Sequence, residues 1–272
     1  MKTHKLFRRW ERRRSKLLEG LSLLREQCQS KGDAEQLHDF RVVLRRLRLL
    51  VRLGRPLIPA NAVVGLRAWG KRMALLTGPV RDVDVALEWL QGQAQGEEAV
   101  ELLQQRRDRL WQRRRRRLVP LSARVVEALA QTKQGSKARD RLESRIRRFD
   151  GRLATLAARW APRILELSPA RQHEFRRAIR WRRYLREIVL PRARQKQDAL
   201  LQQLIRLQEA FGEHQNRTVI SSIAGRLKTW SPKSELMASL ERERLEWRGK
   251  AARALSGLVR AGARAGRRGG RG

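Results

Sequence analysis

The segment His38-Asp39-Phe40-Arg41-Val42-Val43-Leu44-Arg45-Arg46-Leu47-Arg48 recurs in altered form as His173-Glu174-Phe175-Arg176-Arg177-Ala178-Ile179-Arg180-Trp181-Arg182-Arg183. The two copies lie 135 residues apart, about half of the chain. Each copy keeps a histidine followed by arginines three, seven and ten positions later. Because an α-helix turns by about 100° per residue, these four positions fall on one narrow stripe. The sequence therefore predicts two helices that each carry a cationic stripe suited to an anionic ligand.

The first copy also has an apolar face, on the side of the predicted helix opposite the stripe. Its members recur with helical spacing and are Phe40, Val43, Leu44, Leu47, Leu50 and Val51. This pattern is typical of a helix with one face in a core and the other in solvent. The second copy has a poorer apolar face, since Arg182 and Arg186 stand where the first copy has leucine and valine. That side is expected to form an open rim, unless the helix is rotated there.

The overall composition agrees with an anionic partner. Lysine and arginine total 64 against 27 acidic residues, which gives a net charge of +37. Of these cations 53 are arginine, whose planar guanidinium binds phosphate or carboxylate through two hydrogen bonds, although genomic base composition produces the same bias. So high a net charge destabilises a compact chain through self-repulsion, and a bound polyanion would relieve it.

Several classes of protein are disfavoured. The single cysteine, Cys28, has no partner for an internal disulfide, and the first residues lack the apolar core of a secretory signal, so we expect a cytoplasmic protein. No stretch is apolar for long enough to span a membrane. Phosphate-binding loops, dinucleotide-binding glycine motifs, HExxH and zinc-binding spacings are all missing from the sequence. We therefore expect no cofactor, no bound metal and no catalytic residues.

Helical periodicity runs along the whole chain, and period-two alternation is absent. The expected helices are 4–29, 33–53, 60–77, 80–91, 96–131, 136–160, 169–190, 192–211, 213–228 and 234–259. Adding about 135 to the first five nearly reproduces the last five, which predicts two helical halves, 1–133 and 134–260. Pro120 should kink or split its helix. The Gly/Arg-rich tail, 261–272, is expected to be disordered.

A second element recurs as well. Gly78-Pro79-Val80-Arg81-Asp82-Val83-Asp84 is answered by Gly212-Glu213-His214-Gln215-Asn216. In each half the glycine follows the histidine by about forty residues, and Asp or Asn comes four residues after the glycine. The expected position of both segments is the start of a helix.

With both elements present twice, the sequence resembles the CHAD domains, named for a histidine-bearing α-helical domain. The resemblance covers residues 4–259 and implies an all-α fold of two four-helix bundles related by pseudo-twofold symmetry, with a basic groove between them. It also implies binding of inorganic polyphosphate. The residues implied to contact it are His38, Arg41, Arg45, Arg46, Arg48, Arg81, His173, Arg176, Arg180 and Arg183. Those implied to support them are Asp82, Asp84, Tyr184, Glu187 and Asn216.

The sequence departs from the family pattern at two positions. Thr77 precedes Gly78 where an apolar residue is usual, and Asn216 stands where Asp would be expected. Asn216 has no charge with which to orient an arginine.

The roles of individual groups stay open. His38 and His173 either donate hydrogen bonds to phosphate or orient a neighbour. A role as metal ligands is disfavoured because the surrounding arginines repel cations. A role as phosphoacceptors is disfavoured because the sequence has no nucleotide site. Asp82 and Asp84 either stabilise a helix start or, for Asp82, hold an arginine in its phosphate-binding pose. The run 113–117 is either a solvated face or a supplementary anion patch.

The eight tryptophans are widely spaced, which indicates core packing more than base stacking. Binding of polyphosphate without turnover, associated with granules, is thus the favoured function. Non-specific binding of nucleic acid is the alternative, and an enzyme acting on polyphosphate is a third possibility.

Overall fold

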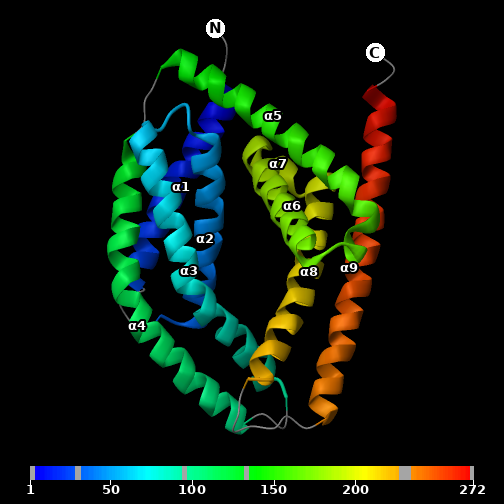
Figure 1. Ribbon diagram of the computed structural model, residues 1–272. Helices are drawn as coiled ribbons and strands as arrows, with labels where there is room; N and C mark the ends of the chain where they lie inside the picture. Colours follow the sequence, from blue (N-terminus) through cyan, green and yellow to red (C-terminus); the bar gives the residue numbers. More distant parts are fainter. Residues whose placement is uncertain (1–3, 28–31, 94–96, 132–134, 227–233, 270–272) are drawn as a thin grey trace. The chain divides into compact units, whose positions relative to one another are not determined.

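The computed structural model describes residues 4–27, 32–93, 97–131, 135–226 and 234–269 (Figure 1). Within these ranges every regular element is helical, and the predicted all-α class is confirmed. The elements are α1 Lys5–Gln27, α2 Ala34–Leu53, α3 Ala60–Gln91, α4 Glu97–Ala130, α5 Ser136–Trp160, the 3₁₀ helix η1 Ala161–Glu166, α6 Pro169–Val189, α7 Arg192–Gln195, α8 Ala199–Ala224 and α9 Ser234–Gly269. No helix in the described ranges has an apolar run long enough to cross a bilayer.

The chain divides into two compact units. The first contains residues 1–145 with 219–232, and the second contains 146–218 with 233–272. The division falls inside α5 because the beginning of that helix packs with the first unit. Arg145 Nε donates to the Arg52 carbonyl at 2.9 Å, and the Arg139 guanidinium lies 4.6 Å from the centre of the Phe7 ring. The expected duplication into the halves 1–133 and 134–260 stays a prediction.

The first unit contains a four-helix bundle. Helix α1 packs on α2, α2 on α3, α3 on α4, and α4 on α1, which closes the ring. The predicted apolar face of α2 lies inside it, with Phe40, Leu44 and Leu47 at most 2% exposed. Trp10 is fully buried, and its indole donates to the Leu50 carbonyl at 3.3 Å. The periodicity of the sequence therefore identified the core side of α2 correctly.

The second unit has its own core, formed by α5, η1, α6, α8 and α9. Phe175 of α6 packs against Phe211 of α8, with ring centres 5.9 Å apart. Leu204 and Leu207 of α8 are fully buried in the same cluster, and α9 adds Leu255. Of the tryptophans that the structure describes, Trp10, Trp111 and Trp160 are buried and the others are half-buried. Packing, as expected, accounts for them; Trp230 lies outside the described residues.

Helix α3 corrects one prediction. The sequence predicts two helices, 60–77 and 80–91, but a single helix runs through Gly78 and Pro79. Pro79 has no N–H, so the Leu75 carbonyl loses its helical donor. Arg114 of α4 replaces that donor, with Nη1 3.1 Å from the Leu75 oxygen and 3.2 Å from that of Leu76. A side chain from another helix thus satisfies the backbone where the proline interrupts it.

Other boundaries also differ from those predicted. The expected helices 192–211 and 213–228 are replaced by the short α7 and by α8, which continues through Gly212. Helix α4 likewise continues through Pro120. Helix α9 extends to Gly269 and so includes most of the segment 261–272, whose expected disorder stays a prediction. Alanine and arginine, which favour helices, alternate there with the glycines.

Candidate functional site

The stripe on α2 begins next to a well-formed helix start. Asp33 caps the helix, accepting a hydrogen bond from the Gln36 backbone N–H at 2.7 Å. On the side away from the core, His38 and Arg48 are exposed, whereas Arg41 and Arg45 are half-buried. The predicted cationic face is therefore present, but its members differ in their access to solvent.

Arg41 is held against α3. Its Nη1 donates to Thr77 Oγ1 at 3.0 Å and to the Ala74 carbonyl at 3.3 Å. Thr77 is itself buried and donates to the Met73 carbonyl at 2.9 Å. Burial, followed by the charge of Arg45, lowers the pKa of Arg41. The residue at which the sequence departs from the family pattern, Thr77, is thus an acceptor for one of the stripe arginines.

His38 lies among positive charges from both helices. Burial lowers its pKa below 6.5, and Arg81 and Arg45 lower it further. Arg81 comes from α3 and lies 3.6 Å from Glu88. The structure therefore brings together His38, Arg45 and Arg81, three of the predicted site residues. Because these groups repel an added proton, they favour the neutral form of His38.

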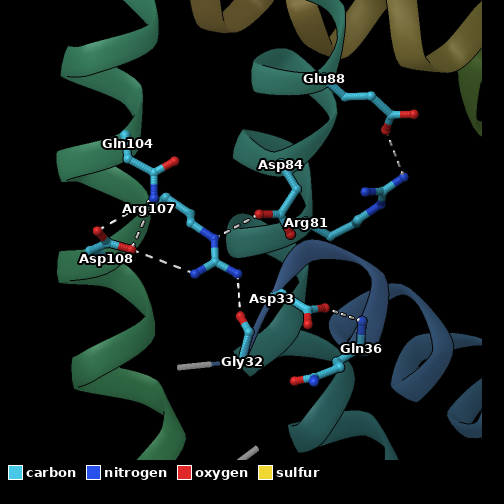
Figure 2. Close-up of polar contacts among 9 residues, drawn as sticks. All are labelled: Gly32, Asp33, Gln36, Arg81, Asp84, Glu88, Gln104, Arg107 and Asp108. Atoms are coloured by element: carbon cyan, nitrogen blue, oxygen red, sulfur yellow. Dashed lines mark hydrogen bonds and ion pairs between the residues drawn. The ribbon is translucent and has the colours of Figure 1, made fainter. Parts of the chain in front are cut away.

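Asp84 and Asp82 have different surroundings. Asp84 is 2% exposed and forms an ion pair with Arg107 of α4, with Nε 2.9 Å from Oδ1 (Figure 2). Arg107 also donates to the Gly32 carbonyl, which joins α4 to the segment before α2. Asp82 is more exposed than Asp84; partial desolvation raises its pKa, while the charges of Arg41 and Arg81 lower it. Asp84 thus orients an arginine by a hydrogen bond, and the same role for Asp82 stays a prediction.

A cavity of about 900 Å³ opens beside this ion pair. It lies among α2, α3 and α4 and includes His38, Arg81, Asp84, Arg107 and Trp111. Its other charged lining residues are Asp33, Glu35, Glu88 and Asp108. Carboxylates thus outnumber arginines in this cavity, which lies within the first unit.

Two buried atoms of this cavity wall have no hydrogen-bond partner among the described residues. They are Asp84 Oδ2 and Trp111 Nε1. One is an acceptor and the other a donor, so both would bond to water or to a polar group placed in the cavity.

Trp111 packs so closely on Gly32, which has a φ of +58°, that any Cβ there would overlap the indole.

The second stripe lies on α6. His173 is exposed, and Arg176, Arg180 and Arg183 are half-buried. Arg176 donates to Gln215 Oε1 of α8 at 2.6 Å, which links the stripe to the second recurring element. Arg183 forms an ion pair of 3.0 Å with Glu187, one turn away. Burial, followed by the charges of Arg176, Arg177 and Arg180, lowers the pKa of His173.

The poor apolar face of α6 is explained by two acids. Arg186 makes two hydrogen bonds to Asp198, at 3.1 and 2.7 Å, and Arg182 lies 3.7 Å from Asp150. The side chain of Arg182 is 15% exposed, so this side of α6 is covered and the expected open rim is wrong. Ile188, Leu185 and the buried Tyr184 supply apolar packing elsewhere on the helix.

The second recurring element lies in the middle of α8 and not at a helix start. Asn216 donates to Glu213 at 3.1 Å, so it contacts an acid in place of an arginine. Glu213 also pairs with Arg217, which in turn lies 3.0 Å from Glu243 of α9. His214, in the same segment, has its pKa lowered by burial and then by Arg244 and Arg176.

The predicted site residues thus form two clusters, one in each compact unit. The first contains His38, Arg41, Arg45, Arg46, Arg48, Arg81, Asp82 and Asp84. The second contains His173, Arg176, Arg180, Arg183, Tyr184, Glu187 and Asn216. The groove expected between the two stripes stays a prediction. The described residues contain no group of three or more His, Cys, Asp or Glu side chains placed to hold a metal ion.

One known protein family shares the two stripes and the two glycine elements. The model of the CHAD domain matches residues 8–224, which include both stripes and both glycine elements. The chain belongs to the CHAD domain family. Among curated proteins none is similar enough to this CHAD protein to count as a match.

Solved structures agree on the fold. The CHAD domain from the plant Ricinus communis is 22% identical with a TM-score of 0.60, over 93% of this chain and 89% of that one. PptA from Streptomyces chartreusis is 16% identical with a TM-score of 0.60, over 96% of this chain and 98% of its own. Both likenesses extend over nearly the whole CHAD chain.

Several residues important to the two clusters are not signalled by the repeat. Arg107 and Trp111 come from α4, where the two halves share no motif. Thr77 was marked only by its departure from the family pattern, and Gln215 only by its place after His214. Each of these residues acts by contacting a motif residue from a second helix or by lining its cavity.

Proposed function

We propose that this CHAD protein binds inorganic polyphosphate through the stripes of α2 and α6 and does not turn it over. The observation that supports this most strongly is the cluster of His38, Arg45 and Arg81, in which burial, and then the charges of Arg81 and Arg45, lower the pKa of the histidine. A linear anion would remove that repulsion. The second unit repeats the feature with His173, Arg176 and Arg180.

Contacts in the first unit assign different tasks to the motif residues. Arg41 is oriented by Thr77 and the Ala74 carbonyl, so it contributes charge from a fixed position. The ion pair of Asp84 and Arg107 joins α3 to α4 below the stripe. We expect the polyanion to follow the exposed side of α2 and not to enter the adjacent cavity, because the carboxylates there would repel phosphate.

No nucleophile and base in hydrogen-bonding geometry accompany the stripes among the described contacts, which favours binding over catalysis. In the cell the protein would then act in the cytoplasm, at polyphosphate granules or as a module that targets other proteins to them. The binding energy would come from guanidinium–phosphate hydrogen bonds and from release of counterions.

The test is a titration of the intact protein with labelled long-chain polyphosphate at physiological salt, followed by fluorescence anisotropy. The proposal predicts tight binding that weakens steeply with salt and no release of orthophosphate, with or without Mg²⁺. Release of orthophosphate would support an enzyme that acts on polyphosphate and would count against a protein that only binds it. Failure of polyphosphate to displace single-stranded DNA from the stripes would also contradict the proposal.

A further inference from the structure

A second groove in the first unit lies between α3 and α4, and it has the charge that the cavity beside His38 lacks. Its volume is about 820 Å³. The lining residues are Arg72, Leu75, Leu76, Leu110, Gln112, Arg113, Arg114, Arg116 and Arg117. They include five arginines and no acid. The groove is therefore strongly electropositive.

Four of these arginines carry charge that no described residue neutralises. Arg72, Arg113, Arg116 and Arg117 are exposed, and none makes an ion pair or side-chain hydrogen bond within the described chain. Arg114 differs, because it is half-buried and bonded to the carbonyls of Leu75 and Leu76. It anchors the centre of the groove while the other four remain available to a ligand.

The spacing of the cations suits a chain of phosphates. Arg116 and Arg117 follow Arg113 by three and four positions on α4, so the three share one face of that helix. The rise of about 1.5 Å per residue places the first and last about 6 Å apart along the axis. Arg72 comes from α3, so the cations belong to both helices that form the groove.

Apolar surface in the same groove limits what the ligand is. Leu75 is 64% exposed, and the half-buried Leu76 and Leu110 also line the groove. Apolar surface next to these cations favours a ligand with apolar faces of its own. A polyphosphate chain has none. An anionic bilayer has apolar parts, but its flat surface does not reach into a recess between two helices. A nucleic-acid strand has both phosphates and apolar base faces.

We propose that the α3–α4 groove binds single-stranded nucleic acid, without sequence preference, independently of the polyphosphate stripes. The guanidinium groups contact successive phosphates, and Leu75 contacts base or sugar. Gln112 is the one uncharged polar side chain in the lining. The groove therefore has no fixed pattern of hydrogen-bonding groups with which to read the edges of bases.

The test compares two variants of the full chain that carry equal changes of charge. In the groove variant Arg72, Arg113, Arg116 and Arg117 are replaced by Gln. In the control, Arg8, Arg12, Arg55 and Arg67 are replaced by Gln; these are also exposed, in the same unit, and without partners among the described residues. Affinity for labelled oligothymidylate, for long-chain polyphosphate and for anionic vesicles is measured over a range of salt concentrations.

The groove variant should lose at least about tenfold in affinity for oligothymidylate, and its salt slope should fall by about 2 to 3, as expected for four lost phosphate contacts to a single strand. The control should lose far less, and polyphosphate affinity should change little in either. Leu75→Ser should weaken oligothymidylate binding alone, since it keeps all the charge. Equal losses in the two Gln variants would overturn the proposal. The proposal would also be overturned if the groove variant lost polyphosphate affinity as strongly as it lost oligothymidylate affinity. A groove variant that lost only its binding to anionic vesicles would overturn it as well.

Discussion

Arg107 Nε lies 2.9 Å from Asp84 Oδ1, and both side chains are almost completely buried. This ion pair joins α3 to α4, and the same guanidinium holds the segment before α2 through the Gly32 carbonyl (Figure 2). Three elements of the first unit therefore meet at one arginine. Asp84, which follows the recurring glycine by six residues, has a structural role that its place in the motif did not indicate.

Replacing Arg107 by Met should destabilise the first unit by about 3–5 kcal/mol, because it leaves the Asp84 carboxylate buried without its partner. The free energy of unfolding is measured by urea denaturation. Arg109→Met, on an exposed part of the same helix, is the control and should change stability by no more than about 0.5 kcal/mol. Equal effects of the two substitutions would show that the buried pair is not important.

Gly32→Ala should destabilise the protein by more than about 2 kcal/mol. A left-handed backbone at φ +58° disfavours any side chain, and the added methyl group would overlap the Trp111 indole. Urea denaturation measures the loss, and near-ultraviolet circular dichroism reports on the tryptophan. An unchanged midpoint would mean that the segment before α2 rearranges easily.

Gly212→Ala should have the opposite effect. Gly212 lies inside α8, and a Cβ at this position meets nothing within 4 Å. Alanine favours a helix interior over glycine by about 1 kcal/mol, so the free energy of unfolding should rise by about that amount. A decrease in stability would show that this glycine has a packing role.

Acidification should strengthen binding of polyphosphate. The pKa of His38 and of His173 is lowered from 6.5 by burial and by neighbouring arginines. A bound polyanion raises both, so the complex takes up protons and affinity increases as the pH falls below about 6.5. For the folding of the free protein the pH dependence has the opposite sign. The unfolded chain binds protons at His38 and His173 more readily than the folded chain, so the free energy of unfolding decreases as the pH falls over the same interval.

Anisotropy titrations between about pH 7.5 and pH 5.5 measure this dependence. The double variant with Gln in place of His38 and His173 should show a much flatter profile. A wild-type profile as flat as that of the double variant would contradict a role for the histidines in binding.

The sequence predicted those features that depend on local periodicity. The core and solvent faces of α2 follow directly from the spacing of Phe40, Leu44 and Leu47. The continuity of α3 was missed because it depends on Arg114, which comes from a different helix. The cavity was missed for a similar reason, since its acids come from three helices and share no spacing.

We propose that the stripes of α2 and α6 both bind polyphosphate. Isothermal titration calorimetry with long-chain polyphosphate tests it most directly, using the wild type, Arg45→Glu and Arg180→Glu. We predict that either reversal reduces the affinity for polyphosphate at least about tenfold, as expected for loss of charge-assisted contacts. Wild-type affinity in either variant would contradict the proposal.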